Sequence, residues 1–208
     1  MSFFSLLRRQ LSVERGKDLR VCVVEKAAEF GGHTLSGAVI ETRALDELIP
    51  DWKDKGAPLK QEAKEDSFVY LTRTGSIKFP IAPPQMNNHG NYIVRLGHVV
   101  RWLSTQAEEA GVELYPSISA ASLLHDDSGA VQGIRTHDVG IGKDGKKKSS
   151  CQPGMDLRAR LTIMAEGCRG HLTRRLEQKF NLRAESSHQT YGIGLKVKMM
   201  LLFLNRDV

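Results

Sequence analysis

Hydrophobic residues follow two different spacings along this chain, and the spacings predict its strands and helices. Residues 19–24 are apolar on both faces, as a strand of a parallel sheet covered by helices requires. Apolar residues recur three and four positions apart over residues 94–110, which predicts an amphipathic helix closed by Gly111. A buried strand and a helix able to cover it are the components of an α/β fold, and we predict that class.

Shorter patterns predict the remaining elements. Residues 118–141 contain a strand, an Asp-Asp-Ser-Gly turn and a second strand, which predicts an antiparallel β-meander. An apolar strand over residues 156–165 is expected to run into a glycine-containing loop. Further helices are predicted over residues 5–15, 42–49 and 171–180, and further strands over residues 112–116 and from residue 189.

Residues 51–90 differ in character from the rest of the chain. They carry several prolines, and residues 67–80 within them have the pattern of two short strands around a turn. We place the turn at residues 73–76 and expect Gly75 to adopt the positive φ of a tight hairpin. The segment is therefore predicted to be an excursion from the main domain.

The composition is typical of a soluble globular protein, with 40% hydrophobic and 26% charged residues. The formal net charge is +6, and residues 142–148 contain four lysines against one aspartate. A lysine run in a glycine-containing loop is usually a solvated turn, and the alternative is a patch that binds nucleic acid or an anionic membrane. Because no aromatic residues interleave with the lysines, we predict no nucleic-acid partner.

Cysteine placement and hydropathy exclude several kinds of site. Cys22, Cys151 and Cys168 are far apart, so their spacing predicts neither a metal site nor a disulfide framework. Cys22 lies in an apolar run and is expected to be a small core residue. No apolar run is long enough for a membrane-spanning helix. We also predict no catalytic nucleophile, because no base is identifiable beside Cys168 and Ser36 lacks a G-x-S-x-G frame.

Glu25 and Arg95 are candidate ligand-binding residues because of their places in the predicted elements. Glu25 ends the strand over residues 19–24, and an acid there accepts hydrogen bonds from ribose hydroxyls in dinucleotide-binding folds. Arg95 opens the predicted helix, where a guanidinium can hold a phosphate. A solvated strand-end acid and an exposed helix arginine are the alternatives, and the pattern alone leaves both open.

Glu166 and Gly167 form a second candidate group in the glycine-containing loop before residue 171. The acid can accept hydrogen bonds from ribityl hydroxyls, and the glycine lets the backbone approach a ligand. His171 is expected to cap the following helix, with contact to a cofactor as the alternative. Cys168 is expected to be an ordinary loop residue.

Several segments together resemble one family. In chain order they are VVEKAAEFGGHTLSGA, PDWKDKGAPL, MNNHGNYIVRLGHVVRWL, AEEAGVELYP, HDVGIGKDG, AEGCRGHLTRRL and QTYGIGLK. From about Leu6 to Lys196, the chain resembles electron transfer flavoprotein–ubiquinone oxidoreductase in the order and spacing of these segments. MNNHGNYIVRLGH and QTYGIGLK are far more specific than a lone glycine motif.

The resemblance implies a glutathione-reductase-like FAD-binding domain, a quinone-binding domain and an iron–sulfur domain. It also implies electron entry from reduced electron transfer flavoprotein, exit to ubiquinone, and a place on the matrix face of the mitochondrial inner membrane, dipping into one leaflet without spanning it. The FAD contacts carried over are Glu25 for the ribose, Gly31, Gly32, Ser36 and Gly37 near the flavin ring, Arg95 at the FAD-facing helix, and Glu166 with Gly167. Gly32 stands where alanine is common in the family, a mild departure.

The resemblance further divides the chain into two domains. Residues 1–50 and 90–187 are expected to be a partial FAD-binding domain that includes the β-meander. Residues 51–89 and 188–208 are expected to be the beginnings of a mixed quinone-binding domain.

The two ends also carry expectations. The first strand and glycine-rich loop of a FAD-binding domain are not found before residue 19, and the 4Fe-4S cysteines of the full-length family are absent. The basic start fits the rear of an amphipathic helix, with an organelle presequence as the alternative. We therefore expect a partial gene model or a truncated isoform that does not transfer electrons alone. A non-catalytic product and a related FAD-dependent monooxygenase or prenyl reductase are the competing hypotheses.

Overall fold

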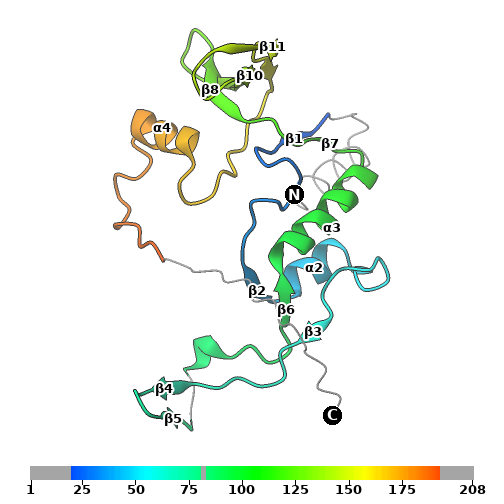
Figure 1. The fold of residues 1–208 in the computed structure, drawn as a ribbon, viewed down its shortest axis with the longest axis vertical. Helices are drawn as coiled ribbons and strands as arrows, with labels where there is room; N and C mark the ends of the chain where they lie inside the picture. Colours follow the sequence, from blue (N-terminus) through cyan, green and yellow to red (C-terminus); the bar gives the residue numbers. More distant parts are fainter. Residues whose placement is uncertain (1–19, 81–82, 193–208) are drawn as a thin grey trace, which may run out of the picture.

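Three α-helices organise the described part of the chain around one long central element, and a short 3-10 helix, η1 (Pro84–Met86), lies apart from them in sequence. The computed structural model describes residues 20–80 and 83–192. α3 (Leu96–Glu109) runs through the middle, with α2 (Arg43–Leu48) beside it and α4 (His171–Phe180) standing apart (Figure 1). These ranges confirm the helices predicted at the corresponding positions. The helix predicted over residues 5–15 lies outside the described residues, as does most of the strand predicted from residue 189.

The strands form small sheets and hairpins. A parallel pair joins β1 (Cys22–Val24) and β7 (Glu113–Tyr115), and the chain passes through α3 between them. Two antiparallel sheets have three strands each. One is β2 (Gly37–Ile40), β6 (Tyr92–Arg95) and β3 (Gln61–Glu62), and the other is β8 (Ala120–His125), β9 (Val131–Thr136) and β12 (Asp156–Arg158). The hairpins are β4 (Val69–Leu71) with β5 (Ser76–Lys78), and β10 (Val139–Ile141) with β11 (Lys147–Gln152).

The hydrophobic core lies where α2, α3 and the β2–β6–β3 sheet meet. Its buried members are Leu45, Ile49, Trp52, Ala57, Leu59, Val94 and Val99. The predicted periodicity of α3 is confirmed, because Val99 and Ala107 turn toward neighbouring elements and are 3% and 1% exposed. Trp52 packs edge-on against Tyr92 with ring centroids 5.7 Å apart, and its indole N–H donates to Asp46 at 2.7 Å.

The β1–β7 pair confirms one expectation and corrects another. The two strands are parallel, as predicted. Beside them, Arg20 donates a bidentate pair of hydrogen bonds to the carboxylate of Glu113, the first residue of β7. Cys22 is exposed, so its prediction as a core residue is wrong. Among the described residues this sheet has only two strands, and no element covers the side chain of Cys22. Burial of the pair is therefore incomplete.

The predicted meander is present as β8, the Asp-Asp-Ser-Gly turn and β9, with β12 added beside β9. Asp126 organises the turn, because its carboxylate accepts hydrogen bonds from the backbone of Ser128 and Ala130 at 2.9 Å. The strand expected over residues 156–165 is largely wrong, since only β12 forms. Leu161 and Ile163 are 69% and 45% exposed, so the described residues leave these two side chains largely uncovered and do not stabilise an extended strand there.

The excursion within residues 51–90 begins later than expected. Residues 52–59 belong to the core and β3 pairs with β6, so the chain leaves the core only after Ala63. Ala63 and Asn91 share a backbone hydrogen bond at 2.7 Å, and the carboxylate of Asp66 accepts two hydrogen bonds from Asn88. These contacts close a neck at the base of the excursion.

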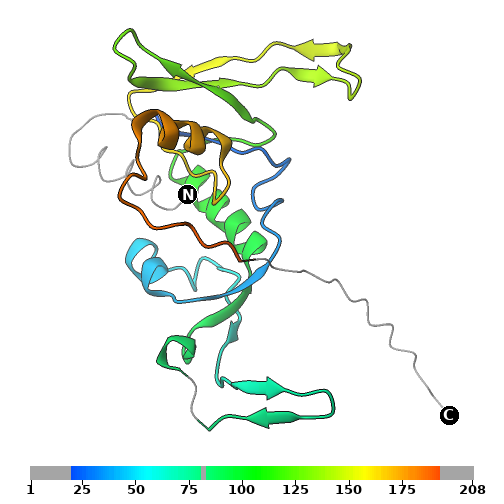
Figure 2. The ribbon, with the colours of Figure 1, turned by 90° about the vertical axis from the view of Figure 1, so that its left-hand side faces the viewer.

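The β4–β5 hairpin at the end of the excursion is confirmed, and it pairs with no other described strand. The turn spans Thr72 to Gly75, but Gly75 does not have the positive φ that we expected. The Thr72 hydroxyl bonds both the N–H and the C=O of Gly75 and holds the turn in another geometry. Figures 1 and 2 show the β4–β5 and β10–β11 hairpins at opposite ends of the molecule.

Candidate functional site

The predicted site residues fall into two groups in the structure. The first group lies in the turn after β1, in β2 and at the start of α3, and comprises Glu25, Gly31, Gly32, Ser36, Gly37 and Arg95. The second group, Glu166 and Gly167, lies in the loop before α4. No hydrogen bond or ion pair between described residues joins the two groups.

Glu25 is held at the carboxyl end of β1 by backbone and side-chain contacts. Its N–H donates to the carbonyl of Tyr115 at 2.9 Å, and its carbonyl accepts from Ile118 at 3.0 Å. One carboxylate oxygen accepts from the N–H of Ala27 at 2.7 Å. The other has no hydrogen-bond partner among the described residues, so a fixed, half-buried acceptor is presented beside the strand end.

Gly31 and Gly97 bring the turn after β1 into backbone contact with α3. Gly31 has φ +82°, and a Cβ there would lie 2.3 Å from the carbonyl oxygen of Gly97. A Cβ on Gly97 would in turn lie 2.9 Å from the carbonyl oxygen of Gly31. Arg101 reinforces the contact through an ion pair with Glu29 at 2.7 Å. The start of α3 is therefore fixed next to the end of β1.

Arg95 lies at the end of a strand and not in the first turn of the helix, where it was predicted. The helix begins at Leu96, and Arg95 is the last residue of β6 and the N-cap position of α3. In the ladder it stands opposite Gly37, and Leu96 donates its N–H to the carbonyl of Ser36 at 3.3 Å. The side chain of Arg95 is exposed beside a helix start that lacks a side-chain cap. A positive charge beside a helix start is compatible with phosphate binding, which stays a prediction for Arg95.

Glu166 serves as the cap of α4 in this structure. Its carboxylate accepts from the N–H of Leu172 at 3.4 Å and from the N–H and hydroxyl of Thr173 at 2.7 and 2.8 Å. Burial raises the pKa of Glu166, but donation by Thr173 and Leu172 outweighs burial and the pKa lies below its usual value. The cap expected of His171 is thus supplied by Glu166, and His171 Nδ1 lies 3.4 Å from it.

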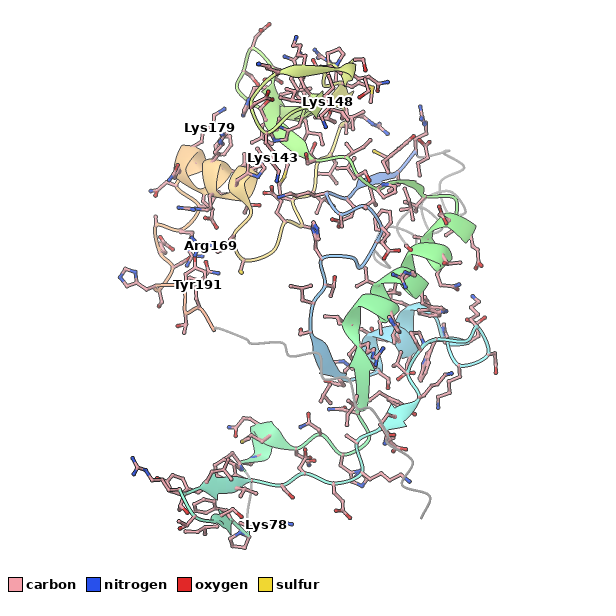
Figure 3. All side chains as sticks on the ribbon, viewed as in Figure 1. Lys78, Lys143, Lys148, Arg169, Lys179 and Tyr191 are labelled. Carbon is pink, nitrogen blue, oxygen red and sulfur yellow. The ribbon has the colours of Figure 1, made fainter. Side chains whose placement is uncertain are left out.

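A cleft of about 560 Å³ opens beside the second group. It lies between the Gly167–Gly170 turn, α4 and residues 183–191, and its lining is largely polar. The guanidinium carbon of Arg169 lies 5.5 Å from the ring centroid of Tyr191, and Figure 3 shows this pair below α4. Sequence reasoning did not identify Arg183 and His188, which also line the cleft. Only the QTYGIGLK motif pointed to that part of the chain.

The donor and acceptor set of the first group is compatible with FAD. A vicinal diol needs a fixed carboxylate acceptor, which Glu25 provides, and a cofactor lying along the backbone needs positions without Cβ, which Gly31 and Gly97 provide. Glu166 fits less directly, because both of its oxygens are already engaged by α4. Gly167 has φ +77°, and no atom lies within 4 Å of the place that a Cβ would take, so this position leaves room for a ligand.

Two further observations concern metals and membranes. Within residues 20–80 and 83–192, no three His, Cys, Asp or Glu side chains gather in a way that could hold a metal ion. Across the same residues, no helix is both long and apolar enough to cross a membrane.

Comparisons with known proteins show which sequences this chain resembles. The chain is 59% identical over 188 residues to the mitochondrial electron transfer flavoprotein-ubiquinone oxidoreductase of Dictyostelium discoideum, and 57% identical over 189 residues to that of Homo sapiens. Each alignment covers 90% of this chain but 31% of the relative, so the chain spans about a third of the length of these relatives. A geranylgeranyl bacteriochlorophyll reductase-like structure from Thermoplasma acidophilum matches at 16% identity with a TM-score of 0.42, over 69% of this chain and 32% of that one.

The family comparison covers most of the chain. Residues 36–202 match the family described as FAD binding domain, a stretch that includes β2, α3, the meander and α4. The α/β fold and the support for FAD as cofactor follow from this match. The chain belongs to the FAD binding domain family.

Proposed function

We propose that this chain is part of a FAD-dependent oxidoreductase that passes electrons from reduced electron transfer flavoprotein to ubiquinone. The observation that carries the proposal is the identity of 56–59% to relatives of that name, sustained over 90% of the chain. Alignments of this length span both candidate groups. The relatives are mitochondrial by name, which supports a mitochondrial location, and we further propose the matrix face of the inner membrane.

In this proposal the first group holds the adenosine and flavin portions of FAD. Glu25 accepts hydrogen bonds from the ribose hydroxyls, and Arg95 offers positive charge to a phosphate at the start of α3. Gly31, Gly32, Ser36 and Gly37 form the backbone beside the flavin ring. FAD supplies the redox chemistry when bound, and these residues supply its position.

The second group takes a supporting role. Gly167 lets the backbone approach the ribityl portion of FAD, and Glu166 fixes that loop by capping α4. A carboxylate that accepts from two backbone N–H groups has oxygen lone pairs left, so it can also accept from a ribityl hydroxyl. The full-length family carries a 4Fe-4S cluster, and we assign no ligand to it in this chain.

The excursion supports the membrane and quinone assignment. The β4–β5 hairpin exposes an apolar set comprising Phe68, Val69, Tyr70, Leu71, Ile77 and Phe79. Phe68 and Phe79 pack against each other with tilted rings whose centroids lie 5.2 Å apart. Exposed apolar side chains on a projecting hairpin are suited to monotopic contact with one leaflet. We therefore propose residues 64–89 and 188–208 as parts of the quinone-binding domain, with the neck at Ala63 and Asn91 as its structural base, whereas residues 52–62 stay with the core and its sheet.

A chimaera tests the function. The matching segment of the Dictyostelium discoideum oxidoreductase is replaced by this chain, and ubiquinone reduction by reduced electron transfer flavoprotein is measured. The proposal predicts a flavin-loaded chimaera with turnover close to that of the parent. A folded, flavin-loaded chimaera without turnover would contradict the electron-transfer assignment.

The same chimaera tests the ribose role of Glu25. Replacing Glu25 with alanine should weaken FAD binding by about 1.5–3 kcal/mol, because a charged acceptor is lost. Glu65→Ala, at an exposed acid in the excursion, is the matched control and should leave affinity unchanged. Equal affinity of the Glu25→Ala and parent proteins in a flavin titration would remove Glu25 from the site.

A further inference from the structure

The β10–β11 hairpin concentrates positive charge, and no ion pair with another described residue neutralises it. Lys143, Lys146, Lys147 and Lys148 are all exposed, and none forms an ion pair with another described residue. The one acid in the turn, Asp144, instead accepts the backbone N–H of Lys146 at 3.2 Å. The lysine charges are therefore available to a partner.

The hairpin presents these lysines on a fixed scaffold. Gly140 has φ +80°, and a Cβ there would lie 2.7 Å from the carbonyl oxygen of Ser150, so the two strands approach closely at this point. At the base, Asp138 accepts the N–H of Gly154 at 2.7 Å. A scaffold of this kind reduces the ordering cost when a partner binds.

Aliphatic side chains accompany the lysines. Val139 and Ile141 are 58% and 45% exposed, and Ile141 stands opposite Lys147 in the ladder. Residues paired across an antiparallel ladder share a face, so this face combines an apolar residue with a charged one. Protein interfaces combine apolar contacts with a polar rim, and charged groups in them steer the approach of a partner.

The position of the hairpin favours a protein over a membrane. Figure 3 labels Lys143 and Lys148 at one end of the molecule and Lys78 of the β4–β5 hairpin at the other. Figure 2 shows the same separation after a quarter turn. If the apolar β4–β5 hairpin faces the membrane, the lysines face away from it toward the aqueous phase.

We propose that the β10–β11 hairpin is a docking surface for an acidic patch on a soluble protein, the electron-donating flavoprotein of the proposed function. The choice of that partner rests on the proposed function, whereas the basic surface does not. Lysines at such a surface accelerate association through long-range attraction, and salt weakens the effect.

The test compares two charge-matched variants of the 208-residue chain. K147E/K148E reverses two hairpin lysines, and K60E/K64E makes the same net change at two exposed lysines outside the hairpin. Binding to purified electron transfer flavoprotein is measured by surface plasmon resonance at low and high salt. Circular dichroism checks folding, and a neutral K147Q/K148Q variant serves if the reversed one does not fold.

We expect K147E/K148E to lower the association rate at low salt by about tenfold and to flatten its salt dependence. K60E/K64E should retain the rate of the unmodified chain. Equal rates for both variants, or no binding by the unmodified chain, would overturn the docking surface. Binding to phosphatidylcholine vesicles containing cardiolipin, or to a duplex DNA oligonucleotide, that the hairpin variant loses while flavoprotein binding persists would also overturn it.

Flavin retention is followed separately by visible absorbance in every variant. A chain that binds the flavoprotein through the hairpin but holds no FAD would leave the docking surface standing, and the chimaera then decides the cofactor site. A chain that holds FAD but binds equally well without the lysines would do the reverse.

Discussion

Large apolar side chains are buried in the core but exposed in the projecting β4–β5 hairpin. In the core, Trp52 is 3% exposed and packs between α2, α3 and the β2–β6–β3 sheet. In the β4–β5 hairpin, Leu71 is 76% exposed, and its strand pairs with no other described sheet. The same apolar chemistry therefore stabilises the fold in one region and is left available for contact in the other.

This difference in burial predicts which property a substitution will change. Changes in the core should lower the free energy of unfolding, and changes in the hairpins should alter binding while leaving that free energy nearly constant. The turn after β1 and the cap of α4 lie between these extremes, because each is partly exposed and yet fixed by specific contacts.

The largest effect is expected in the core. Trp52→Ala should lower the free energy of unfolding by about 3–5 kcal/mol, since a large buried ring is removed and a cavity remains. Chemical denaturation followed by circular dichroism measures it. Trp52→Phe keeps an aromatic ring against Tyr92 but loses the hydrogen bond to Asp46, and it should cost less. A Trp52→Ala protein as stable as the parent would show that this cluster is not the core.

The backbone contact between Gly31 and Gly97 predicts the next effect. Gly31→Ala should cost about 1–2 kcal/mol for the left-handed backbone and about 1–3 kcal/mol more for the collision with Gly97. Gly90→Ala is the matched control, because Gly90 has the same φ of +82° but nothing within 4 Å of its Cβ position. The difference in unfolding free energy between the two variants isolates the close approach. Equal losses would mean that the turn does not touch α3.

The cap of α4 predicts a smaller, pH-dependent effect. Glu166→Gln should lower the free energy of unfolding by about 0.5–2 kcal/mol near neutral pH, as loss of a capping group does. The folded-state pKa of Glu166 is lowered, so its contribution is complete above the unfolded value of about 4.3 and is lost as pH falls through the folded value.

Denaturation at several pH values checks this cap. The gap between parent and Glu166→Gln should close in acid, whereas Glu185→Gln, at an exposed acid, should show no gap at any pH. A gap that is constant from neutral to acidic pH would show that the charge of Glu166 is not what caps the helix.

Sequence periodicity predicted the elements whose partners lie close in the structure. The pattern of α3 was confirmed because Val99 and Ala107 meet neighbouring elements, and the Asp-Asp-Ser-Gly turn was confirmed because its hydrogen bonds are local. The same apolar signal misled over residues 159–165, where no described strand lies alongside. β6 was missed because its partner β2 is distant in sequence and its residues overlap a helical pattern.

For the candidate site, the sequence identified the residues but not the contacts that they make. Strand-end position identified Glu25, and the resemblance to a flavoprotein family identified the glycines near it. The partner of Gly31 was not predictable, because the contact with Gly97 depends on how the turn folds back on α3. Nor was the engagement of Glu166 with Thr173, since a strand-end acid can serve a ligand or a helix equally well.

The smallest effect on stability is expected in the β4–β5 hairpin. A substitution there should change membrane binding while leaving the free energy of unfolding nearly constant. Leu71→Ser should change the free energy of unfolding by no more than about 0.5 kcal/mol, because an exposed side chain already lies in water. Leu45→Ser makes the identical change at a residue that is 7% exposed, and it should cost at least about 2–5 kcal/mol. Vesicle flotation adds a second measurement, since Leu71→Ser should bind membranes less well than the unmodified protein does. A hairpin variant that unfolds the protein, or one that binds vesicles unchanged, would remove the contrast between the two regions.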